Sequence, residues 1–143
     1  IRVIPGMDPS VFDYITAHCR GVVIESFGVG GIPYYGDNAF EEKIAALMEN
    51  GVRVVITTQV PHEGSNLSVY RVGHIIKEKY RVLEASNMTT EAVIAKMMWA
   101  LAYSETREEF EKDMLKSYET CRQRPIINCI RLRRVILPFG QCK

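Results

Sequence analysis

A glycine-rich stretch holds the first residues whose types and spacing could do chemistry. Gly28, Gly30 and Gly31 lie within four residues, directly after a mostly apolar run over residues 21–27. Such a loop can cradle a phosphate, but the dinucleotide-binding pattern needs a third glycine where Pro33 stands, and a helix that begins at once. No Lys-Ser/Thr pair follows to form the other common phosphate loop. A nucleotide site is therefore disfavoured. A structural turn, or a loop that lets a ligand or another chain approach the backbone, remains.

A second polar stretch, Thr57-Thr58-Gln59, follows another apolar run, and Ser26 stands near the end of the first one. Two hydroxyls and an amide at a strand end can hold a carboxylate or an amide ligand. The alternative is that they satisfy the backbone of their own turn. Ligands of parallel sheets bind outside the carboxyl ends of the strands. We therefore treat Ser26, Thr58 and Gln59, together with the glycines, as candidate binding residues at one sheet edge.

The other reactive residue types predict neither a metal centre nor a complete catalytic unit. The three histidines are scattered, with no Asp or Cys at ligand spacing, so we expect no metal and no cofactor. The four cysteines match no zinc pattern and are interpreted as free thiols of a reducing cytoplasm, the alternative being an oxidised tail. Glu25, near the end of an apolar strand, must be partnered or reach solvent, because an unpaired buried carboxylate is costly. No nucleophile has a neighbouring base in the sequence.

These residues depend on alternating strands and helices for their placement. Apolar runs predict strands at residues 1–4, 21–27, 52–57 and 81–85. Helical spacing and capping residues predict helices over about 8–19, 39–50, 74–79, 90–101 and 106–117. Asp8, Asn38 and Thr89 are the expected N-caps, and Val93, Met97, Ile94 and Met98 are expected on one helix face. The order predicts the α/β class, a three-layer Rossmann-like fold with a mostly parallel sheet of about four strands flanked by helices.

Composition bounds the domain organisation. The 143 residues, with 47% hydrophobic and 24% charged, suit one globular domain, and no apolar run is long enough to span a membrane. Residues 120–143 hold six of the 18 Lys and Arg and none of the 17 acidic residues. We therefore expect an α/β domain over 1–118 and a basic, cysteine-containing tail over 119–143. The start at Ile1, directly in a strand, favours a piece of a longer protein.

Several motifs in order resemble one protein family. Residues 21–33, GVVIESFGVGGIP, resemble the G-x-V-L-x-S-Y-G-x-G-N-x-P segment of the cytoplasmic (type I) bacterial L-asparaginases. Residues 51–59 look like the second strand and loop of that family, and Tyr70-Arg71-Val72-Gly73 is similar to its Y-x-x-G. NMTTEA at 87–92 resembles its D-M-T-x-E-A. The resemblance covers residues 1 to about 118 and concerns the carboxy-terminal domain of the family.

The resemblance implies a function that this chain serves only in part. Family members hydrolyse L-asparagine to L-aspartate and ammonia with a threonine nucleophile, a second threonine and an Asp–Lys pair, all in an amino-terminal domain that this chain lacks. The carboxy-terminal domain completes the site of a neighbouring subunit. The resemblance thus implies a cytoplasmic homo-oligomer, a dimer or tetramer, with no nucleic-acid or membrane partner. The implied active-site-completing or ligand-binding residues are Ser26, Gly28, Gly30, Gly31, Thr58, Gln59 and Tyr70.

The sequence departs from the family pattern at two positions near the predicted sheet edge. Two other functions also stay open. Gly31 takes the place of the family's Asn, and Glu25 stands where regulated members often have Arg. The alternatives are an asparaginase-like subunit that feeds ammonia to a tRNA-dependent amidotransferase, and a non-catalytic module that binds a small molecule or a subunit. The isolated chain is predicted to be inactive.

Overall fold

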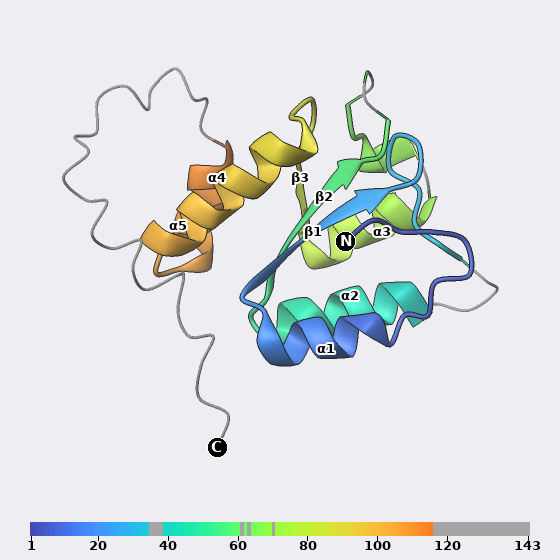
Figure 1. Ribbon diagram of the computed structural model, residues 1–143, viewed down its shortest axis with the longest axis horizontal. Coiled ribbons are helices and arrows are strands. Elements are labelled where there is room, and N and C mark those ends of the chain that lie inside the picture. Colours follow the sequence, from blue (N-terminus) through green and yellow to red (C-terminus); the bar gives the residue numbers. More distant parts are fainter. Residues whose placement is uncertain (35–38, 61, 63, 70, 116–143) are drawn as a thin grey trace. The chain divides into compact units, whose positions relative to one another are not determined.

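The computed structural model describes residues 1–34, 39–60, 62, 64–69 and 71–115 of the chain (Figure 1). The chain divides into two compact units, Ile1–Ile94 and Ala95–Lys143. The predicted tail, 119–143, lies beyond residue 115 and so outside the described residues. No helix among the described residues is long and apolar enough to cross a membrane.

The first unit is built on a parallel sheet with the strand order β1-β2-β3. β1 (Gly21–Ser26) and β2 (Arg53–Thr58) pair in parallel over their whole length, and β3 (Leu83–Glu84) is a short strand on the other side of β2. The segment 1–4, predicted as the first of four strands, runs beside β1 but forms only one parallel bridge, between Arg2 and Glu25. The α/β class with a parallel sheet flanked by helices is confirmed.

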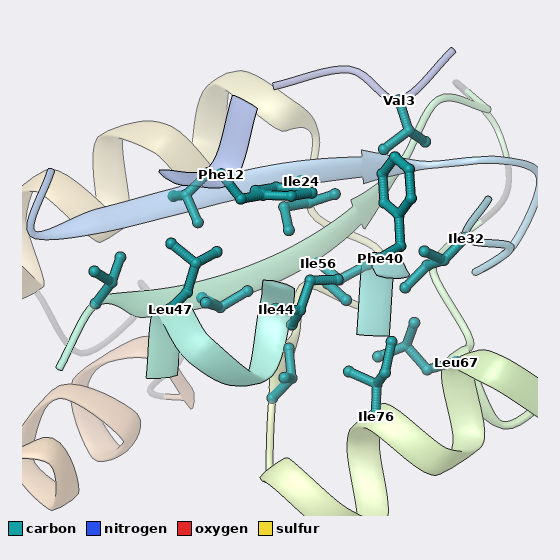
Figure 2. Close-up of a cluster of buried hydrophobic side chains, with 14 residues drawn as sticks. Val3, Phe12, Ile24, Ile32, Phe40, Ile44, Leu47, Ile56, Leu67 and Ile76 are labelled. Atoms are coloured by element: carbon teal, nitrogen blue, oxygen red, sulfur yellow. The ribbon is translucent and has the colours of Figure 1, made fainter. Parts of the chain in front are cut away.

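Three helices of the first unit surround the core on one face of this sheet: α1 (Val11–His18), α2 (Ala39–Glu49) and α3 (Arg71–Tyr80), which follows a short 3-10 helix, η1 (Leu67–Val69). Side chains alternate across a strand, so Ile24 and Ile56 point to the same face. They join the buried cluster there. Figure 2 shows Phe40, Ile44 and Leu47 of α2 pointing toward the sheet. Burial of this apolar surface is the main force that holds the strands and helices of the first unit together.

Helix boundaries differ from the expectations where a local hydrogen bond competes with the helix. Asp8 is not the N-cap of α1, because its Oδ1 accepts a hydrogen bond from Ser10 N at 2.8 Å and forms a turn before Val11. Thr89 does cap α4 (Thr90–Tyr103), since its Oγ1 accepts from Ala92 N at 3.3 Å. Asn38, the expected cap of α2, lies outside the described residues.

The predicted apolar face of α4 is wrong in part. Val93 and Met97 are buried, whereas Ile94 and Met98 are 44% and 48% exposed. Each residue turns the helix by about 100°, so positions 94 and 98 lie beside the buried stripe and not on it. The second unit continues from Ala95 along α4 into α5 (Arg107–Leu115), in which Phe110 and Met114 are buried.

Candidate functional site

The carboxyl ends of β1 and β2 meet at one edge of the sheet, where the candidate residues gather. Ser26, the last residue of β1, stands in register with Thr58, the last residue of β2. The glycine turn, residues 27–31, leaves β1 at this edge, and Gln59 follows β2 there. The sequence therefore placed these residues at one edge correctly.

The glycine turn is a tight reversal closed by its own backbone. Phe27 N donates to Gly31 O at 2.8 Å, and Gly31 N donates to Phe27 O at 2.7 Å. Gly28 has a φ of 49°, in the left-handed region that favours glycine. A Cβ at Gly31 would lie 3.2 Å from Phe27 O, so this position has little room for a side chain.

Gly30 is required by packing within the chain. A Cβ at this position would lie 2.9 Å from Asn66 O and 3.0 Å from the Cα of Leu67. Asn66 N also donates a hydrogen bond to Val29 O. From the other side, a Cβ at Gly73 of α3 would lie 2.6 Å from Leu67 O and 3.0 Å from Gly30 O. The backbone of residues 66–67 is therefore held between the glycine turn and α3.

The hydroxyls of Ser26 and Thr58 are engaged by the backbone. Ser26 is fully buried, and its Oγ donates to Thr57 O at 2.7 Å. Thr58 Oγ1 donates to Gly28 O and accepts from Val60 N at 3.0 Å. Thr57 points to the opposite face of the sheet, and within the described part of the chain its buried Oγ1 has no hydrogen-bond partner. Thr58 thus fixes the glycine turn, and among the described residues its hydroxyl is bonded to backbone groups and not to a base.

Gln59 joins the amino-terminal segment to β1. Its Nε2 donates to Val3 O at 2.7 Å and to Glu25 O at 3.0 Å. One amide therefore ties two neighbouring backbone segments together at the sheet edge. Tyr70, the remaining candidate, lies outside the described residues.

Glu25 was expected either to have a partner or to reach solvent, and the structure gives it partners. Arg2 Nε lies 3.0 Å from Glu25 Oε2, and Arg2 Nη2 donates to Oε1 at 3.3 Å. Thr90 Oγ1, at the start of α4, donates to Oε1 at 2.8 Å. The hydrogen bonds from Arg2 and then from Thr90 hold the pKa of Glu25 below its ordinary value, against the raising effect of burial. Glu25 thereby connects β1 to the first residue of α4.

Several of these residues, but not Ser26 or the glycine turn, help to line a cavity of about 340 Å³ at the strand ends. Its walls come from Arg2 and Glu25, from Thr58 and Gln59, and from residues 87–91 before and within the start of α4. The lining offers hydrogen-bond donors and acceptors that suit a small polar ligand. Among the described residues, no group of three His, Cys, Asp or Glu side chains could hold a metal ion. Among the described residues that line the cavity, the hydroxyl of Thr90 is bonded to a carboxylate, and that carboxylate, Glu25, is itself paired with Arg2.

Glu84 is a residue that the sequence did not single out. Its Oε1 accepts a hydrogen bond from Leu67 N at 2.6 Å, and its Oε2 lies 2.8 Å from Lys77 Nζ. The available signal was a charged residue inside the apolar run predicted over 81–85. A carboxylate in a strand needs a partner, but the sequence does not say which backbone amide supplies it.

The sequence matches one family model, described as the Glutaminase/Asparaginase C-terminal domain, over residues 1–114. It is 40% identical over 114 residues to an L-asparaginase of Thermococcus kodakarensis, covering 80% of this chain and 34% of that protein. It is 32% identical over 119 residues to a glutamyl-tRNA(Gln) amidotransferase subunit of Pyrococcus abyssi, covering 82% of this chain and 26% of that one.

Solved structures give the same picture. The fold matches the thermostable L-asparaginase from Thermococcus kodakarensis with a TM-score of 0.73 and 37% identity, over 82% of this chain and 35% of that one. It matches L-asparaginase I from Vibrio cholerae with a TM-score of 0.71 and 26% identity, over 82% and 34% of the two chains. The chain therefore spans about a third of the length of the asparaginases it matches.

Proposed function

Because the chain belongs to the glutaminase/asparaginase C-terminal domain family, we propose that it is the carboxy-terminal domain of an L-asparaginase and completes the active site of a neighbouring subunit. The observation that carries this proposal is the family match over residues 1–114, together with 40% identity to an L-asparaginase. The reaction is the hydrolysis of L-asparagine to L-aspartate and ammonia.

The described residues support a completing role and not a catalytic one. Amide hydrolysis needs an activated nucleophile, a base close to it and donors for the developing oxyanion. The hydroxyls at the strand ends, Ser26 and Thr58, are bonded to backbone groups instead. We therefore assign the nucleophile to an amino-terminal domain of the full-length protein, as the family resemblance implies. What this domain contributes is the glycine turn, a rigid backbone reversal that another subunit can approach closely.

The finer parts of the proposal concern the subfamily and the assembly. We place the full-length protein among the cytoplasmic type I asparaginases, as a dimer or tetramer, and the similarity to L-asparaginase I from Vibrio cholerae supports this. The 40% identity to an archaeal L-asparaginase means that a bacterial origin forms no part of the proposal.

A second function has one observation in its favour. Several relatives are named as subunits of a glutamyl-tRNA(Gln) amidotransferase, with identities up to 32%. In that case the same domain would belong to a protein that releases ammonia for transfer. The asparaginase is preferred because identity to it is higher and the chain covers a larger share of it, 34% against 26%.

A chimeric enzyme tests the proposal. Residues 1–114 replace the segment that they match in the Thermococcus kodakarensis L-asparaginase, and ammonia release from asparagine is measured with a coupled assay. We expect release that is absent from the same enzyme truncated before this domain. A chimera that folds and assembles like the parent enzyme, yet releases no more ammonia than the truncated one, would reject the proposal.

A further inference from the structure

We propose that Glu84 is a positioning residue, which fixes the backbone of residues 66–67 and through it the glycine turn. Its effect on catalysis rests on the proposed function, whereas its effect on the glycine turn does not. Residues 66–69, which contain η1, are called the Leu67 turn below.

Glu84 holds the Leu67 turn with both of its carboxylate oxygens engaged. Oε1 accepts from Leu67 N at 2.6 Å, and Oε2 is paired with Lys77 Nζ of α3 at 2.8 Å. The Glu84 side chain is 13% exposed and Leu67 is fully buried, so solvent screens the contact little. The first amides of a short helix have no partner inside it, so Leu67 N needs an acceptor from another segment.

The same segment is attached next to β3 a second time. Ser65 N donates to Ser86 O at 2.7 Å, two residues away from the Glu84 contact on each segment. β3 itself contains only Leu83 and Glu84, and Ala85 N donates to Ile56 O at 2.9 Å. β3 therefore joins β2 to the Leu67 turn: its backbone pairs with β2, and the Glu84 side chain binds the Leu67 turn.

The Leu67 turn in turn fixes the glycine turn. Asn66 N is bonded to Val29 O, and there is no room for even a methyl group between Gly30 and residues 66–67. On the α3 side, a Cβ at Gly73 would likewise lie too close to Leu67 O and Gly30 O to fit. Protein interiors are close-packed and transmit strain, so a displacement of Leu67 has to displace Gly30 or break these contacts.

Amide hydrogen exchange in the 143-residue chain tests the coupling directly. Glu84→Ala leaves Leu67 N buried without its acceptor. We expect exchange at Gly30 and Gly31 to become at least ten-fold faster, and their amide resonances to move with that of Leu67. Glu84→Gln keeps an acceptor oxygen and should restore most of the protection.

Glu41→Ala is the matched control. Glu41 lies in α2, its side chain is 14% exposed, and it also pairs with a lysine of α3, Lys79, at 3.7 Å. This variant removes a carboxylate of similar burial without touching the Leu67 turn. If Glu84→Ala accelerates exchange at Gly30 and Gly31 no more than Glu41→Ala does, the coupling does not exist and the proposal fails.

Kinetics of the chimera then separate positioning from stability. Under the proposed function the glycine turn lies against the active site of a neighbouring subunit while the nucleophile lies elsewhere, so Glu84→Ala should raise KM for asparagine at least ten-fold and leave kcat within three-fold. Glu84→Gln should stay within three-fold of the parent in both. An unchanged KM, with the turn loosened, would show that Glu84 is only structural. An inactive parent chimera would count against the proposed function and not against the coupling, which the exchange data decide.

Discussion

Gly73→Ala sets a gain in helix propensity against a loss of packing where α3 meets the Leu67 turn. Gly73 lies inside α3, where glycine costs about 0.8–1 kcal/mol relative to alanine in helix propensity. If helix propensity alone mattered, the variant would be more stable than the parent chain by about that amount.

The structure predicts the opposite sign. The added methyl group would lie 2.6 Å from Leu67 O and 3.0 Å from Gly30 O, and both are backbone atoms that cannot rotate away. Overpacking of this kind costs about 1–3 kcal/mol. Movement of the Leu67 turn also weakens its hydrogen bond to Glu84 or to Val29, worth about 1 kcal/mol or more. After the helix-propensity gain is subtracted, a net loss of about 1–3 kcal/mol remains.

Urea unfolding of the 143-residue chain, followed by circular dichroism, measures this difference. Gly51→Ala is the comparison variant, because Gly51 has a φ of +80° but open space around its Cβ. It introduces backbone strain of about 1–2 kcal/mol without a clash, and should leave exchange at Gly30 unchanged. A Gly73→Ala chain that is as stable as the parent, or more stable, would refute the close packing of α3 against the Leu67 turn.

Three further changes have defined outcomes. The pKa of Glu25 is lowered in the folded chain, so its contribution to stability is present above its ordinary value of 4.5 and is lost as pH falls through the lower folded value. The difference in unfolding free energy between the parent chain and the Glu25→Gln variant should therefore shrink below pH 4.5. A difference that stays constant down to about pH 2 would contradict the ion pair between Glu25 and Arg2. Deletion of residues 120–143 should leave the melting temperature nearly unchanged. A loss of more than about 2 kcal/mol in the free energy of unfolding would show that the tail buries large side chains. Gly31→Asn in the chimera should change kcat or KM at least ten-fold if the turn touches substrate. The change can come from a hydrogen bond to a charged group, worth about 1.5–3 kcal/mol, or from the shift of Phe27 O that a Cβ only 3.2 Å away requires. Kinetics within two-fold of the parent would count against that contact.

The sheet could be predicted because its signal is local. The apolar runs Val22–Ile24 and Val54–Ile56 are continuous, as expected for strands covered on both faces, and polar residues and glycines follow them. Residues 1–4 carry the same signal but form a single bridge. Residue types report the tendency of a segment to be extended. How many of its backbone groups pair depends on the segment that lies beside it in the fold.

The roles of the site residues were less accessible, because they depend on contacts between distant segments. Gly30 stands 36 residues before Asn66, and only the folded backbone shows that their approach leaves no space for a side chain. Thr58 and Gln59 were expected as ligand contacts, and the structure shows hydrogen bonds to Gly28 O, Val3 O and Glu25 O. Glu84 had no sequence signal beyond its charge, since its partner Leu67 N is a backbone atom 17 residues away.

Ammonia release by the purified 143-residue chain tests most directly whether this domain completes a site or forms one. We expect no hydrolysis of asparagine or glutamine by the chain alone, because loss of a complete nucleophile-and-base unit removes about 10⁶-fold in turnover. Mixing the chain with the truncated Thermococcus kodakarensis L-asparaginase should then restore measurable release. Release of ammonia by the chain alone, abolished by Thr58→Ala, would contradict the completing role and make this chain an enzyme in its own right.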